Sequence, residues 1–142
     1  MLDRTDEISR LIEPGRVHRR VYTDPDIFEL EMDRIFGRAW LFVGHASQVR
    51  EPGDYITTDL GRQPMIMTRH HDGSVRVLFN RCTHRGAKVV NERCGHSNRL
   101  VCCYHGWTFD MDGALIGVPV PEGCAARRAV ERRVMDRRTL AG

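Results

Sequence analysis

Two short stretches decide how this chain folds: NRCTHRGAKVV at residues 80–90 and LVCCYHGWTFD at residues 100–110. The first contains Cys82-Thr83-His84, and the second contains Cys102-Cys103-Tyr104-His105. The pattern is C-x-H, then seventeen residues, then C-x-x-H. Each stretch places one thiol and one imidazole within a single turn, between runs of strand-forming residues. The sequence therefore predicts two hairpin tips that meet around a metal centre.

Two kinds of metal centre use two cysteines and two histidines. Tetrahedral zinc accepts this set, but zinc ribbons and fingers usually keep their two cysteines together and their two histidines together. A Rieske-type [2Fe–2S] cluster needs two cysteines on one iron and two histidines on the other, and two turns of mixed type supply them. The pattern favours this cluster on Cys82, His84, Cys102 and His105, with zinc as the alternative.

The flanking sequence predicts one helix followed by short strands. Asp24 can cap a helix that starts at Pro25, and apolar residues then recur at helical spacing as far as Phe36. From Trp40 onward, β-branched and aromatic residues form runs separated by turn residues. The predicted strands are 40–43, 54–60, 65–69, 75–80, 100–103, 107–109 and 114–118. Short strands at this spacing are typical of an antiparallel sandwich or small barrel.

Length and composition favour one globular domain in the cytoplasm. The 142 residues can bury a core, and a hydrophobic share of 41% is ordinary. The net charge of +3 is mild, and the Arg/Ala-rich stretch 124–142 lacks interleaved aromatics, so we expect no nucleic acid partner. No apolar run approaches the roughly 18 residues of a membrane span, and the acidic N-terminus is unlike a signal peptide.

The two cysteine–histidine boxes and their surroundings resemble a known family. The span from about Arg16 to Gly123 is similar to the N-terminal Rieske domain of the α (large) subunit of aromatic-ring-hydroxylating dioxygenases. The resemblance is carried by residues 24–36, 38–40, 52–55, 80–87 and 104–110. It implies a mainly β fold, an antiparallel Rieske-type sandwich with cluster-binding hairpin loops, preceded by an N-terminal helix. It also implies electrons from a reductase or ferredoxin, and partner α or β subunits.

The resemblance also assigns roles to individual residues. Cys82 and Cys102 would bind one iron, and His84 and His105 the other. Backbone N–H groups of the two turns would contact the sulfurs, glycines would allow the backbone to approach closely, and a tryptophan would cover the cluster. The residues placed next to the cofactor in this way are Arg85, Gly86, Tyr104, Gly106 and Trp107.

One residue departs from the family pattern. Cys103 stands where the family usually has proline, next to Cys102. Cys103 as the ligand would break the spacing to His105, so Cys102 is retained. Cys94 and Cys124 are expected to be free thiols, and the histidines of the polar turns (His70, His71 and His96) are expected to be solvated.

The family's mononuclear Fe(II) needs two histidines and a carboxylate, and no histidine pair at helical spacing provides them here. We therefore expect no catalytic residue in this chain and a mononuclear iron only in a missing domain. The expected segments are 1–37 (arm and helix), 38–123 (Rieske domain) and 124–142 (tail, a candidate for a disrupted reading frame). A free-standing Rieske ferredoxin and a zinc module are the alternatives to a truncated α subunit.

Overall fold

The computed structural model describes residues 5–119. The chain divides into two compact units, one up to Leu41 and one from Phe42. The tail 124–142, including Cys124, lies outside the described residues, so the expectations for it stay predictions.

The N-terminal unit is built from short helices and one small hairpin. Its elements are α1 (Thr5–Ser9), β1 (Ile12–Glu13), β2 (Arg16–Val17), α2 (Arg20–Thr23), α3 (Pro25–Glu31) and a π-helical turn, η1 (Met32–Phe36). The predicted helix 24–36 is confirmed as α3 with η1, and the Asp24 side chain caps it by accepting the Asp26 N–H at 3.0 Å. The hairpin β1–β2 was not predicted.

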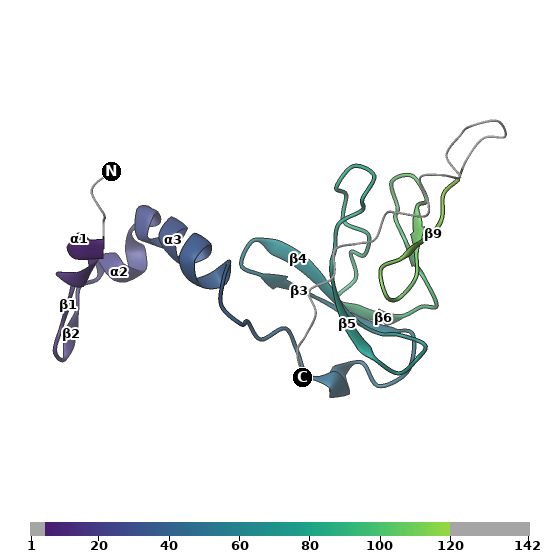
Figure 1. The fold of residues 1–142 in the computed structure, drawn as a ribbon, viewed down its shortest axis with the longest axis horizontal. Helices are drawn as coiled ribbons and strands as arrows, with labels where there is room; N and C mark the ends of the chain where they lie inside the picture. The colour runs from purple at the N-terminus through teal and green to yellow at the C-terminus, as the bar shows by residue number, and fades with distance from the viewer. Residues whose placement is uncertain (1–4, 120–142) are drawn as a thin grey trace. The chain divides into compact units, whose positions relative to one another are not determined.

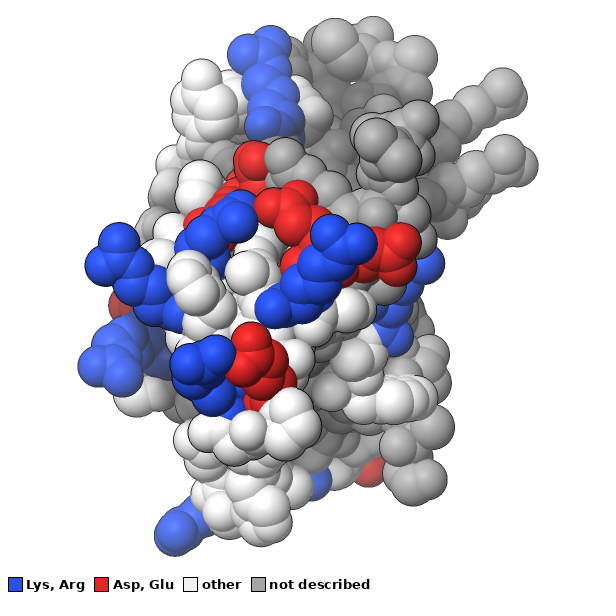
Figure 2. Space-filling view, turned by 90° about the vertical axis from the view of Figure 1, so that its left-hand side faces the viewer, with Lys and Arg blue, Asp and Glu red and all other residues white. Residues whose placement is uncertain are grey.

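Ion pairs hold the polar side of this unit. Arg20 contacts Asp24 at 2.8 Å and Glu7 at 3.1 Å, so one guanidinium links α1 to the start of α3. The hydrogen bond from Arg20 is the main reason why the pKa of Asp24 lies below its ordinary value. Cationic and anionic side chains are interleaved in the view of Figure 2 instead of forming a patch of one sign.

The second unit contains two antiparallel sheets (Figure 1). A 3₁₀ turn, η2 (Ala46–Gln48), precedes β3 (Asp54–Leu60), β4 (Gln63–Arg69), β5 (Val75–Phe79) and β6 (Cys94–His96), which form one sheet in the order β5-β4-β3-β6. The other sheet is β7 (Leu100–Val101), β8 (Thr108–Phe109) and β9 (Leu115–Gly117). The expected mainly β, antiparallel architecture is confirmed.

Strand β4 is buried on both faces, which explains how the two layers pack. Met65 and Met67 point to a small core with Val49 and Val77. Ile66 points to the opposite, larger core, which contains Phe109 and both Cys82 and Cys102. Thr68 shares that face and donates its hydroxyl to the Met111 carbonyl at 2.6 Å, so a buried hydrogen bond links β4 to the turn between β8 and β9.

The strand predicted at 40–43 is wrong. These residues have no ladder partner, and Trp40 and Phe42 are 78% and 84% exposed. Their apolar side chains led to the prediction of a strand. In the four-stranded sheet, however, the partner at the outer side of β3 is β6 and not residues 40–43. β6 itself was not predicted, because Cys94-Gly95-His96 has neither β-branched residues nor alternation. None of the helices between residues 5 and 119 combines the length and the apolar composition that a membrane span requires.

Candidate metal centre

The first predicted tip, which we call loop 1 (residues 82–87), leaves the four-stranded sheet after β5. The Cys82 N–H donates to the Ala87 carbonyl at 2.8 Å, and the Gly86 N–H donates back to the Cys82 carbonyl at 2.8 Å. Gly86 has φ +75°, a left-handed conformation that a side chain disfavours. These bonds close a tight turn with His84 near its apex.

Loop 2 (residues 102–107) joins β7 to β8 and repeats this frame. The Cys102 N–H donates to the Trp107 carbonyl at 2.8 Å, and the Gly106 N–H donates to the Cys102 carbonyl at 2.9 Å. Gly106 has φ +67°. Both loops therefore have the same backbone closure, although histidine is the third residue of loop 1 and the fourth of loop 2.

The two cysteines lie inside the larger core. Cys82 is 3% exposed and Cys102 is 2% exposed. Burial is the main reason why the pKa of the Cys82 thiol is raised, and contact with the Cys102 side chain raises it further. The backbone N–H groups of His84 and Arg85 donate to the Cys82 sulfur, and these bonds lower its pKa and partly offset the effect of burial. The two thiols are thus neighbours, with backbone donors next to one of them.

The two histidines meet on the outer side of the loops. The Nδ1 atoms of His84 and His105 are 3.1 Å apart, and the rings cross at 71°. This distance is shorter than the combined length of two metal–nitrogen bonds of about 2.0–2.1 Å each, so one ion placed between the rings can contact both nitrogens. Trp107 stacks on His84 with ring centres 4.8 Å apart and planes 10° apart, and the ring centre of Tyr104 lies 3.9 Å from that of His105. Aromatic contacts therefore orient both imidazoles.

The donor set is two pairs instead of one group of four. In the described residues no three His, Cys, Asp or Glu side chains converge on a point that could hold one ion. A single zinc ion needs such convergence, whereas a two-iron cluster needs one iron on a cysteine pair and one on a histidine pair. The thiol pair and the imidazole pair fit the cluster, and the chemistry of the donors is that of a Rieske centre.

The remaining candidate residues lie as follows. Cys103 is exposed, with the Asn91 amide 3.9 Å from its sulfur, while its neighbour Cys102 is buried. Cys94 is an exposed free thiol on β6, as expected. The side chains of His71 and His96 are 47% and 60% exposed, and His96 contacts Asp54 at 2.9 Å. The expectation of a solvated His70 is wrong, because its side chain is 19% exposed and lies 3.0 Å from Asp72.

Comparison with known proteins identifies relatives of this chain. The family model described as "Rieske [2Fe-2S] domain" matches residues 39–129. The α subunit of benzene 1,2-dioxygenase from Pseudomonas putida is 44% identical over 117 residues, which are 81% of this chain and 26% of that protein. The chain thus spans about a quarter of the length of this curated relative.

Solved structures agree with the sequence comparison. Naphthalene 1,2-dioxygenase from Rhodococcus sp., bound to indole, superposes with a TM-score of 0.77 at 30% identity and covers 93% of this chain and 30% of its own. A quaternary ammonium Rieske monooxygenase in complex with gamma-butyrobetaine superposes with a TM-score of 0.67 at 31% identity, over 82% of this chain and 32% of its own. The same fold therefore occurs in proteins whose substrates are chemically unlike one another.

Proposed function

Because the chain belongs to the Rieske [2Fe–2S] domain family and matches the N-terminal portion of aromatic-ring-hydroxylating dioxygenase α subunits, we propose that it is the electron-input domain of such an α subunit. Cys82 and Cys102 hold one iron in this proposal, and His84 and His105 hold the other. The single observation that carries the proposal is the pairing of like donors, with buried thiols on one side and facing Nδ1 atoms on the other.

The residues around the four ligands have separable tasks. The larger core excludes water from Cys82 and Cys102, and backbone N–H groups of loop 1 donate toward sulfur. Trp107 and Tyr104 fix the ring planes of the two histidines. Gly86 and Gly106 supply the left-handed backbone that lets each loop close. When bound, the cluster accepts and passes on single electrons.

The activity of the whole protein follows from its relatives and is part of the proposal. Electrons would come from a reductase or ferredoxin and pass to a mononuclear Fe(II) site in a further domain, in an assembly with other α or β subunits in the cytoplasm. The matched relatives act on benzene and naphthalene by their names, so we propose an aromatic hydrocarbon as the substrate class.

A free-standing ferredoxin is the second candidate. The naphthalene dioxygenase structure covers 93% of this chain, which includes most of the N-terminal unit that precedes the Rieske fold. That extent favours a dioxygenase subunit over a minimal carrier. The segment boundaries 37/38 and 123/124 stay predictions, since the two compact units divide between Leu41 and Phe42 and the family match runs from 39 to 129.

The proposal is tested by reconstituting the 142-residue chain with iron and sulfide. We expect a red-brown protein whose reduced form gives the rhombic electron paramagnetic resonance signal of a mixed Cys/His cluster. Its midpoint potential should lie in the Rieske range of about −150 to +300 mV. Replacing either imidazole, in His84→Ala or His105→Ala, should abolish the signal.

Two variants serve as controls for the loss of a histidine or a thiol. His71→Ala and Cys94→Ser change exposed residues away from the two loops and should keep the full signal. Stoichiometric zinc without acid-labile sulfide in the wild-type chain would contradict the proposal.

A further inference from the structure

The two cluster loops are closed at their bases in different ways. Loop 2 stands on a strand ladder, in which Leu100 pairs with Phe109 and Val101 pairs with Thr108. Loop 1 has no such stem: β5 ends at Phe79, and the chain returns through residues 88–91, which belong to no strand. Something other than a ladder must fix where loop 1 leaves and re-enters the core.

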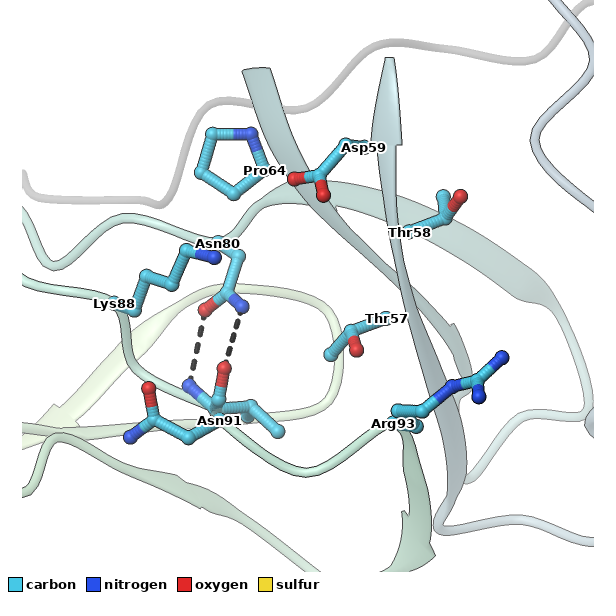
Figure 3. A pocket seen from close by; sticks show the side chains of 9 residues that line it. Thr57, Thr58, Asp59, Pro64, Asn80, Lys88, Asn91 and Arg93 are labelled. Atoms are coloured by element: carbon cyan, nitrogen blue, oxygen red, sulfur yellow. Dashed lines mark hydrogen bonds between the residues drawn. The ribbon is translucent and has the colours of Figure 1, made fainter. Parts of the chain in front are cut away.

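The side chain of Asn80 spans this gap. Its Oδ1 accepts the N–H groups of Val89 at 2.9 Å and Val90 at 3.0 Å, and its Nδ2 donates to the Val90 carbonyl at 2.6 Å. The two dashed lines that start at the labelled Asn80 side chain in Figure 3 are its bonds to the backbone of Val90, which is drawn without a label. The Asn80 N–H donates to the Pro64 carbonyl at 2.7 Å, so the same residue is also anchored to β4.

These bonds satisfy backbone groups that the core would otherwise leave without partners. Val89 and Val90 are 4% and 6% exposed and pack in the same cluster of buried residues as Cys82 and Cys102. Burying their amides is unfavourable unless each finds an acceptor, and no strand is available to them. Asn80, itself 2% exposed, provides both acceptors and one donor with one amide. Its side chain therefore replaces one rung of a ladder.

We propose that Asn80 is a positioning residue for the cluster, closing loop 1 as the β7–β8 ladder closes loop 2. The inference rests on the proposed function, because it concerns the ligands Cys82 and His84. Cys82 is two residues after Asn80, and His84 is four residues after it. The three side-chain bonds of Asn80, which we call the clamp, therefore fix the base of the turn that carries both residues. Without the clamp the two loops would no longer hold their donors at one fixed separation.

The test compares cluster-loaded wild type with Asn80→Ala and Asn80→Asp. Asn80→Ala removes all three side-chain bonds and leaves buried backbone groups without partners, so we expect bleaching of the cluster by an iron chelator to be at least about tenfold faster. We also expect broadened resonance features and a shifted midpoint potential. Asn80→Asp keeps the acceptors for Val89 and Val90 but replaces the donor with a carboxylate oxygen that faces the Val90 carbonyl, so its cluster should also bleach faster than that of wild type.

Controls separate positioning from general stability and from the proposed function. Asn98→Ala removes an exposed asparagine from the turn before β7 and should match wild type. A purely structural role for Asn80 predicts a lower melting temperature with unchanged signal and potential in the folded protein, and that result would overturn the inference. A wild-type chain without a Rieske signal would instead contradict the proposed function.

A measurement on the wild-type protein covers the case in which Asn80→Ala does not fold. Hydrogen–deuterium exchange resolved to single amides should find Val89 and Val90 protected, because both N–H groups are bonded to a buried acceptor. Exchange at these two amides as fast as in the exposed turn 71–73 would show that the clamp does not persist in solution, and would overturn the inference.

Discussion

Burial separates the two kinds of proposed ligand side chain within a few residues of each other. Cys82 and Cys102 are buried, while His105 is exposed and His84 is half-buried. A thiolate in an apolar core is unfavourable unless a metal or a donor stabilises it, which agrees with the raised pKa of Cys82. Neutral imidazoles need no such compensation, and here they lie nearer the surface than the thiols. The two thiols are thus shielded from water, whereas the two imidazoles are more accessible.

The glycines of the two loops allow a prediction at this scale. Gly86 has φ +75°, and a Cβ added there would meet nothing closer than the Arg81 side chain at 3.9 Å. Gly106 has φ +67°, and a Cβ there would lie 2.9 Å from Pro119 Cγ. Gly86→Ala should therefore cost only the left-handed strain of about 1 kcal/mol. Gly106→Ala should cost more, because contact is added to strain.

Thermal unfolding followed by circular dichroism checks the order of these two variants. The loss of about 1 kcal/mol in Gly86→Ala corresponds to a melting temperature lower by about 4 °C, and Gly106→Ala should melt lower still. Gly73→Ala is the matched control, since Gly73 has φ +81° in open space, away from the loops. Equal effects in Gly86→Ala and Gly106→Ala would contradict the assigned contact with Pro119.

At the scale of elements, pattern and propensity predict what is locally encoded. The capped helix from Asp24 and strand β3 were predicted because a helix cap and a run of β-branched and aromatic residues are each visible in a single stretch. β6 and the clamp on loop 1 were not predicted. β6 exists because β3 offers it an edge, and Asn80 bonds to residues nine and ten positions away, so both depend on tertiary contacts that no local pattern contains.

The pairing of β3 with β6 supplies the second prediction. Asp54 and His96 are ladder partners, and their side chains lie 2.9 Å apart. The Asp54 carboxylate also accepts the N–H groups of Arg50 and Glu51. The bond from the Glu51 N–H first, and His96 second, hold the pKa of Asp54 below its ordinary value. A carboxyl with a lowered folded-state pKa stabilises the fold above its unfolded pKa of about 3.9 and loses this contribution as the pH falls through the folded value.

The expected result is a pH-dependent difference between wild type and Asp54→Asn. Wild type should be the more stable protein at pH 7, and the difference should shrink as the pH falls below about 4. Urea midpoints measured by circular dichroism at about pH 7, 4 and 3 give this difference directly. Asp59→Asn, which changes an exposed aspartate of the same strand, is the control and should differ little from wild type at any pH. A constant difference for Asp54→Asn would show that its carboxylate charge has no role.

At the scale of the whole molecule, the Rieske fold fixes a mode of electron transfer but no substrate. Relatives of similar fold are named for benzene, naphthalene and a quaternary ammonium compound. In these three comparisons the chain covers about a third or less of the other protein, so a likeness over this region does not distinguish one substrate from another.

The last prediction concerns what the 142 residues do as an isolated polypeptide. Oxygen activation at a mononuclear iron needs two histidines and a carboxylate with open positions, and no such group of three is found in the described residues 5–119. The reconstituted polypeptide should accept electrons from a reductase with NADH, visible as bleaching of the oxidised cluster, yet form no product. Product analysis with benzene, naphthalene and benzoate, in the presence of added ferrous iron, provides the measurement. The His84→Ala variant is the control for electron uptake, because without its cluster it should neither bleach nor draw electrons from NADH. A dihydrodiol or phenol formed by the wild-type polypeptide alone would show that an oxygen-activating iron site lies within these residues.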